Sequence, residues 1–118
     1  MSERITFVDT NVLVAESSGV VSTQVLAELS SVLRRKVGLA PAAARRVVVV
    51  YTAWPIVQID APMLAAAMLR NQQDDGSWWD CLIVEAALRA GAARLASEDF
   101  EVGHAFDSVL DVVDPLAA

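Results

Sequence analysis

Four acidic side chains have the type and the placement needed to bind a divalent metal ion. They are Asp9, Glu28, Asp80 and Asp99. Two carboxylates about 5 Å apart repel each other by about 3 kcal/mol at an effective dielectric constant of about 20. A cluster of four would therefore be driven to protonate unless a cation neutralised it. Mg²⁺ and Mn²⁺ prefer such oxygen ligands, and an ion held in this way activates water for the hydrolysis of phosphodiester bonds.

The predicted secondary structure brings these four residues to one place. Asp9 and Asp99 each follow a predicted strand, whereas Asp80 and Glu28 each lie near the start of a predicted helix. The carboxyl ends of the strands and the amino ends of the helices share one edge of a doubly wound sheet. We therefore expect the four carboxylates to face one crevice. The elements concerned are the strands 5–8 and 93–96 and the helices 23–37 and 77–90.

Each acidic residue also has a structural explanation that involves no metal. Asp80 follows Ser77 by three residues and could be the acidic half of a capping box. Asp99 could cap a short helix, and Glu28 could reach water from the edge of its apolar stripe. Asp9 is the hardest to explain in this way, because a carboxylate within an apolar strand end is costly unless it is paired.

The remaining pattern predicts one α/β domain over residues 1–118. Strands alternating with helices indicate a central parallel five-stranded sheet with helices on both faces. The segment 10–18 is too short for a normal crossover between parallel strands, which takes a dozen or more residues. Either the first crossover is shortened to a turn at 11–15 plus a loop, or a segment is absent from the chain. The other expected elements are the strands 19–22, 56–59 and 109–113, the helices 41–53 and 61–70, and a loop at 71–76.

The composition indicates a soluble protein of the cytoplasm. Hydrophobic residues make up 55% of the chain, yet no apolar stretch is long enough to span a bilayer and no signal peptide opens the sequence. The single cysteine, Cys81, excludes an internal disulfide and a cysteine-based metal site, and we expect it to be a small buried hydrophobe.

The net charge of -6 at first argues against a nucleic-acid partner, since affinity for phosphate normally comes from Lys and Arg. The charges are unevenly distributed, however. Residues 1–59 carry six basic and four acidic side chains, and residues 60–118 carry three basic and eleven acidic ones. A basic rim that contacts RNA or a partner protein, with Arg34 and Arg35 as members, remains open beside the alternative of solvated helix faces.

Two adjacent tryptophans precede the third acidic residue. Only one of them can lie fully on the core face of the helix, and we expect this to be Trp79. Trp78 is then expected at the rim, where it could stack on an RNA base or contact a partner protein. The only histidine, His104, has no nucleophile marked near it, so nothing indicates covalent catalysis.

Four short motifs, each containing one of the acidic residues, extend over nearly the whole chain. They cover residues 7–13, 22–28, 79–84, and 97–100 followed by 103–104. In these motifs and their order the chain resembles the PIN-domain ribonucleases, in particular the VapC-like toxins of bacterial toxin–antitoxin pairs. A single motif would be a weak signal, whereas four in the same order are a strong one.

The resemblance implies a PIN fold, cleavage of RNA that depends on Mg²⁺ or Mn²⁺, a homodimer, and inhibition by a cognate antitoxin bound across the active-site groove. It assigns metal binding and catalysis to the four acidic residues. Polar support for them would come from Thr10, Asn11 and Ser97. The segment 10–18 is shorter than in most relatives, which affects one wall of the groove.

Other classes of protein fit less well. A haloacid-dehalogenase-like phosphatase needs a second Asp where Asn11 stands, a receiver domain needs a late Lys although Lys36 is the only one, and a Rossmann domain needs a glycine-rich turn after the first strand. The alternative that stays open is a PIN-like binding module with weak or no catalysis, which acts through its partner.

Overall fold

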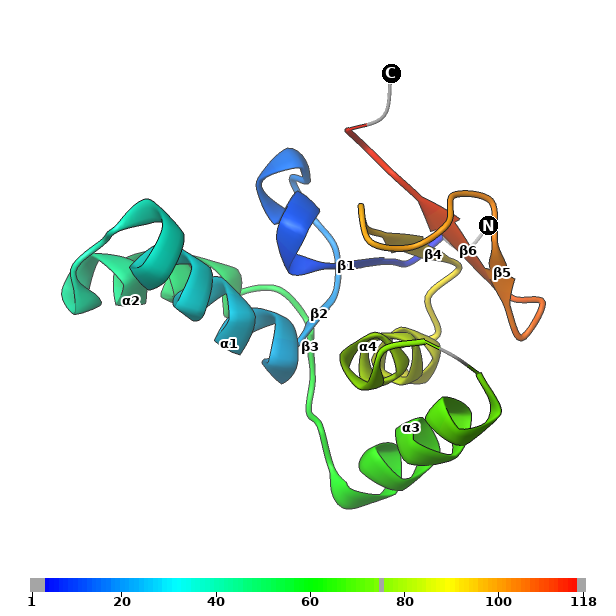
Figure 1. Ribbon diagram of the computed structural model, residues 1–118. Coiled ribbons are helices and arrows are strands. Elements are labelled where there is room, and N and C mark those ends of the chain that lie inside the picture. The colour runs from blue at the N-terminus through cyan, green and yellow to red at the C-terminus, as the bar shows by residue number, and fades with distance from the viewer. Residues whose placement is uncertain (1–3, 75, 117–118) are drawn as a thin grey trace.

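The computed structural model describes residues 4–74 and 76–116, and these residues form an α/β fold (Figure 1). Its strands and helices alternate along most of the chain, as the sequence predicts. The elements are β1 (Thr6–Val8), the 3₁₀ helix η1 (Thr10–Ala15), β2 (Val21–Ser22), α1 (Thr23–Val32), the π-helical turn η2 (Leu33–Val37), α2 (Pro41–Tyr51), β3 (Ile56–Val57), α3 (Ala61–Gln73), α4 (Trp78–Arg89), β4 (Arg94–Ala96), β5 (Ala105–Phe106) and β6 (Leu110–Val113).

The five predicted strands run parallel to one another. β1, β4 and β6 are neighbours in one sheet, and β2 and β3 form a separate parallel pair. A parallel bridge between Phe7 and Val20 joins the two, with backbone bonds from Val8 N to Val20 O and from Val20 N to Thr6 O, both 2.9 Å. The predicted parallel sheet is therefore confirmed. The short antiparallel edge strand β5 was not predicted.

The first crossover is short, as predicted. Only η1 and a loop connect β1 to β2, and η1 begins where the Asp9 side chain accepts a hydrogen bond from Thr10 N. Val12 and Leu13 of η1 are fully buried, which anchors this turn to the core. The site residue Asp9 is thus held between a strand and a helix that are both packed inside.

The core lies between the sheet and α4. Phe7 and Val8 of β1 and Leu95 of β4 are fully buried. The helix α4 packs against both β2 and β4. Its residues Cys81 to Val84 are all buried, which confirms the expectation for the cysteine. Burial on nearly every side of α4 sets its amino end firmly beside the sheet edge.

The helices α1 and α2 form a hairpin that extends away from the sheet (Figure 1). The expected helix 23–37 is regular only to Val32 and continues as the π-helical turn η2, which ends at Gly38 with a left-handed φ of 83°. The helix expected at 41–53 is formed over Pro41–Tyr51. Only Ala44 of α2 is buried.

The helix α3 is longer than the sequence predicts. It extends through Gln73 and is closed by a backbone bond from Asp74 N to Arg70 O, so the predicted loop at 71–76 begins later. Within the described part of the chain, no helix is long and apolar enough to cross a bilayer.

We predict that Gly19→Ala destabilises the fold. A Cβ at Gly19 would stand 2.6 Å from Val8 Cγ2 and 3.1 Å from Thr6 O, so the bridge between the two sheets would have to shift. Overpacking of this kind costs about 1–3 kcal/mol. Urea unfolding measures it, with Gly76→Ala as the matched control, because nothing lies within 4 Å of a Cβ there. Equal stability of the two variants would contradict the prediction.

Candidate active site

Asp9 lies at the carboxyl end of β1 and is 5% exposed. Its Oδ1 accepts a hydrogen bond of 2.8 Å from Thr10 N. Its Oδ2 accepts one of 2.8 Å from Ser97 Oγ, which belongs to the segment after β4. The carboxylate is therefore oriented by the first residue of η1 and by the residue that follows the neighbouring strand β4.

Two further bonds order the segment after β4, and one of them joins it to the segment after β1. The buried Ser97 Oγ accepts from Asp99 N at 3.0 Å, so this hydroxyl connects Asp99 to Asp9. Asn11 Oδ1 accepts from Glu98 N at 3.2 Å. These bonds hold the loop that carries Asp99 against the start of η1. The polar residues predicted to support the carboxylates thus lie among them.

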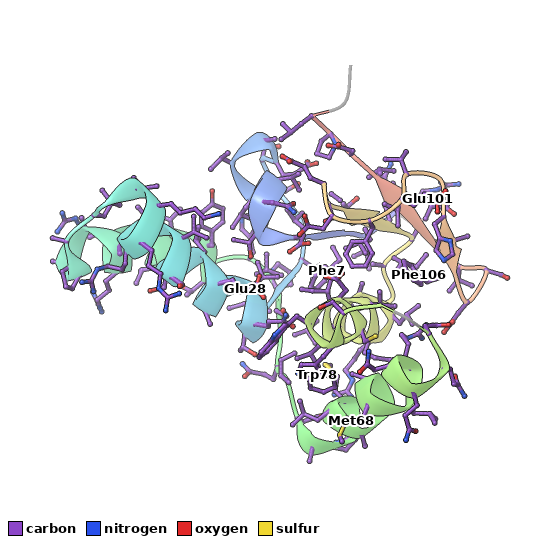
Figure 2. All side chains as sticks on the ribbon, in the orientation of Figure 1. Phe7, Glu28, Met68, Trp78, Glu101 and Phe106 are labelled. Carbon is purple, nitrogen blue, oxygen red and sulfur yellow. The ribbon has the colours of Figure 1, made fainter. Side chains whose placement is uncertain are left out.

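Glu28 faces the same region from α1 (Figure 2). Its Oε2 lies 3.3 Å from Thr10 Oγ1, whose hydroxyl also bonds to Val25 O at 3.1 Å. Its Oε1 accepts from Gln24 Nε2 at 2.9 Å, and the same amide group donates to Trp79 O at 3.3 Å. Glu28 is therefore tied to η1 and, through Gln24, to the first turn of α4.

Asp80 lies in the first turn of α4 and is half-buried. The N-cap Ser77 accepts from Trp79 N, and in the described chain Asp80 donates or accepts no side-chain hydrogen bond that would complete a capping box. No helix begins at Asp99 either, and its side chain is exposed. The structural alternatives for these two residues were therefore wrong.

Burial raises the pKa of Asp9 to about 6 from an ordinary value of 3.8. The hydrogen bonds from Ser97 and Thr10 oppose this rise. Repulsion by Glu28 and Asp99 adds to it. The carboxylate is thus held in a position where its charged form is disfavoured, which is unusual for an acidic residue outside a functional site.

Asp80 shows the same effect to a smaller extent. Burial raises its pKa first, followed by repulsion from Asp99 and Glu28. In residues 4–74 and 76–116 the ion pairs all lie elsewhere, so none of the four carboxylates has a basic partner. The structure brings the four residues into one electrostatically coupled group without a protein cation to balance it.

The chemistry of this group fits a hard divalent cation. Every candidate ligand is a carboxylate oxygen, and Gln24 adds a buried amide oxygen, Oε1, that has no hydrogen-bond partner. Across the described chain, however, no three His, Cys, Asp or Glu side chains are close enough to hold an ion as they stand. Binding would therefore require side-chain rotations or bridging water. Gln24 was missed by the sequence analysis, although its spacing of four residues before Glu28 places both on one helix face.

The burial of the two tryptophans is the reverse of that expected. Trp79 is 60% exposed, whereas Trp78 is partly buried and packs against the core. Beside Glu28 there is a groove of about 580 Å³ between α1 and α4, and Trp79, Ile59 and Leu82 form most of its apolar wall. The exposed ring next to the carboxylates is therefore that of Trp79.

Arg34 and Arg35 lie in η2, outside the carboxylate group. Both side chains are exposed. They follow Glu28 along the same helical hairpin, so they flank the group and do not neutralise it.

Comparison with known proteins gives a family and a fold. A model of the PIN domain matches residues 6–105. Comparison with curated proteins found no match. Among solved structures, the chain is similar to the crystal structure of Mycobacterium tuberculosis VapC20, described as a toxin that cleaves the sarcin-ricin loop. The TM-score is 0.59 with 18% sequence identity, over 80% of this chain and 91% of that one.

We predict that the stability of the metal-free protein, relative to that of Asp9→Asn, falls as the pH rises from about 4 to about 6. The folded state binds the Asp9 proton more tightly than the unfolded state does, so stability decreases with pH in this window. At about 1.4 kcal/mol per pKa unit, the loss from Asp9 is at most about 3 kcal/mol. The Asp9→Asn variant has no titratable group at this position, so its stability lacks this pH dependence.

The measurement is the free energy of unfolding by urea of the wild type and of Asp9→Asn, in the presence of a chelator and at several pH values. Asp9→Asn should be the more stable at pH 7.5, with a difference that shrinks toward pH 4. Asp111→Asn is the control, because Asp111 is exposed. Parallel curves for the wild type and Asp9→Asn would show that the burial of Asp9 has no such cost.

We further predict that Ser97→Ala lowers the free energy of unfolding by about 1–3 kcal/mol, because it leaves a buried Asp9 oxygen and Asp99 N without their shared partner. It should also raise the pKa of Asp9 further, since the Ser97 bond lowers that pKa. The pH range over which stability falls in the previous experiment should then extend to higher pH. Ser18→Ala, at an exposed serine, is the control. An unchanged pH range would mean that Ser97 does not position the carboxylate.

Proposed function

Since the chain belongs to the PIN-domain family, a family of nucleases, we propose that it is a metal-dependent endoribonuclease that hydrolyses RNA phosphodiester bonds. One observation carries the proposal: four acidic residues from four separate elements are coupled at one sheet edge without a basic partner in the described chain. Such an arrangement costs stability, and a cation offsets this cost. Selection for a metal-dependent reaction explains why the cost is kept.

Asp9, Glu28, Asp80 and Asp99 would hold Mg²⁺ or Mn²⁺. A bound divalent cation supplies a Lewis acid that lowers the pKa of water and stabilises charge on the phosphate. Asp9 is the residue most firmly oriented for this role, by Thr10 N and Ser97 Oγ. The side chains of Thr10, Asn11 and Ser97 position the carboxylates and do not contact the reacting atoms.

Trp79 would contact the RNA in place of Trp78. Its exposed ring borders the groove beside Glu28, and every base offers a face on which an aromatic ring can stack. Stacking of this kind contributes about 1–3 kcal/mol per base. A base in the groove would place the neighbouring phosphate near the carboxylates.

The protein would act in the cytoplasm as the toxin of a toxin–antitoxin module. The similarity to VapC20, whose described activity is cleavage of the sarcin-ricin loop, supports this proposal at the level of the fold. A cognate antitoxin would place a basic side chain in the carboxylate group, because an acidic pocket without its own cation is a natural site for Arg. A homodimer is also proposed, supported by the apolar side chains exposed on α3, which are Leu64, Met68 and Leu69. Figure 2 labels Met68 on this helix.

A second candidate function is a PIN-like binding module with weak or no catalysis. It has one observation in its favour: in the described residues the carboxylates are not close enough to hold an ion as they stand. RNA cleavage by the pure protein, dependent on added metal, separates the two candidates.

We predict that Asp9→Asn reduces RNA cleavage by at least about 100-fold while the fold is retained, because it removes a charged ligand with almost no change of shape. Asp80→Asn and Asp99→Asn should be nearly as severe. Asp111→Asn should retain full activity, because Asp111 is exposed and lies opposite Arg94 at the start of β4, whereas Asp99 follows the other end of that strand. Circular dichroism confirms the fold of each variant.

The assay incubates pure protein with single-stranded and structured RNAs in Mg²⁺, in Mn²⁺ and in chelator. Cleavage should occur only with metal. Undiminished cleavage by Asp9→Asn, or by the wild type in chelator, would overturn the proposed function.

A further inference from the structure

The hairpin formed by α1, η2 and α2 carries an excess of positive charge that the rest of the molecule lacks. Residues 29–59 contain no acidic residue at all, whereas the remainder of the chain contains all fifteen acidic residues and only four basic ones. We use the name basic hairpin for residues 29–51, which run from the second half of α1 through η2 to the end of α2. Its five basic residues are Arg34, Arg35, Lys36, Arg45 and Arg46.

These five side chains are available to a ligand. Each of the five residues is exposed. In the part of the chain that the structure describes, the ion pairs involve Arg70 and Arg89 instead, and no side-chain hydrogen bond occupies a basic group of the hairpin. A cluster of like charges that is not balanced internally destabilises the fold slightly, so a binding role is the more economical explanation.

The basic hairpin is continuous with the carboxylate group. Glu28 lies on α1, and Arg34 follows it by six residues, or about 9 Å along a helix axis. Arg34 and Arg45 come from different helices and line one hollow of about 280 Å³. Figure 1 shows the hairpin leaving the body of the protein on the side where β1 ends, which is the side of Asp9. A chain that passes over the carboxylates can therefore continue along the hairpin.

We propose that the basic hairpin binds the phosphates of the RNA strand next to the bond that is cut, with Arg34 and Arg45, which line one hollow, contacting two adjacent phosphates. This rests on the proposed function for the identity of the ligand. The acidic site repels a polyanion, so a substrate of this charge needs a cationic surface beside it. Among residues 4–74 and 76–116, the hairpin is the stretch that offers such a surface, and the helix that carries Glu28 leads into it.

The proposal predicts how strongly the affinity for RNA depends on salt concentration. Neutralising one phosphate of a single strand contributes about 0.7 to the slope of log affinity against log salt. Five contacts give a slope of about -3.5, which weakens binding about 100-fold between 50 and 200 mM salt. Removing two charges reduces the slope to about -2.1, and the same change of salt then weakens binding only about 20-fold.

The test measures binding of a fluorescent single-stranded RNA to the full chain carrying Asp9→Asn, so that the RNA stays intact. The double variant Arg34→Ala/Arg45→Ala should bind more weakly at low salt, with the slope reduced by about 1.4. The pair Arg34→Lys/Arg45→Lys should keep the original slope. Arg4→Ala removes one charge at the amino end of β1, opposite the site, and should change the slope by less than about half a unit.

Thermal unfolding shows that each variant is folded, and the lysine pair separates loss of charge from loss of packing. An unchanged slope in the alanine pair, an equal effect of Arg4→Ala, or no RNA binding at all would overturn the proposal. So would loss of binding to an acidic partner protein with RNA affinity unaffected, because the hairpin would then be a protein-binding surface.

The two proposals fail in different ways. If the wild type does not cleave RNA but the hairpin variants still show the slope change, the nuclease is wrong and the RNA-binding hairpin stands. If the wild type cleaves RNA and the slope is unchanged, only the hairpin is wrong.

Discussion

The buried carboxylate of Asp9 is the constraint on which the rest of the site depends. A carboxylate that is 5% exposed pays a desolvation penalty, which its hydrogen bonds from Thr10 and Ser97 reduce but do not remove, since its pKa still rises to about 6. Those bonds come from the first residue of η1 and from the residue that follows β4, the parallel neighbour of β1. The short crossover, the bridge between the sheets and the tight approach of Gly19 to Val8 all serve to place β1 where this can happen.

Charge is divided between two parts of the molecule. The sheet edge gathers acidic groups that repel one another, and the basic hairpin gathers cationic groups that do the same. Each arrangement lowers stability on its own. Together they suit a substrate that is a polyanion and a reaction that needs a cation, because the substrate contacts the hairpin while the metal offsets the carboxylates.

Much of the fold could be predicted because hydrophobic spacing determines it. The five parallel strands, the helices α1, α2, α3 and α4 and the shortened crossover follow from apolar runs, caps and segment lengths. β5 could not be predicted, since a strand of two residues has no periodicity. The prediction that Trp79 faces the core was wrong. Cys81 to Val84 are all buried, so the sequence of α4 does not single out one buried face of the helix.

Part of the candidate site could likewise be predicted from the sequence, and part could not. Asp9 could be picked out because its apolar neighbours make a surface position impossible, and the short motifs picked out Glu28, Asp80 and Asp99. Gln24 was missed because a glutamine within an amphipathic helix resembles any other polar position. Its role comes from contacts to Glu28 and to Trp79 O, which are four and fifty-five residues away, and no local pattern encodes the second.

The central claim is that the coupled carboxylates form a site for a divalent cation, and the most direct test is the shift in thermal unfolding when metal is added to chelator-treated protein. Saturating Mg²⁺ or Mn²⁺ at about 100 times its Kd should stabilise the wild type by about 2.7 kcal/mol. The same addition should leave Asp9→Asn nearly unchanged. An equal shift in the two proteins, or no shift in the wild type, would contradict the account.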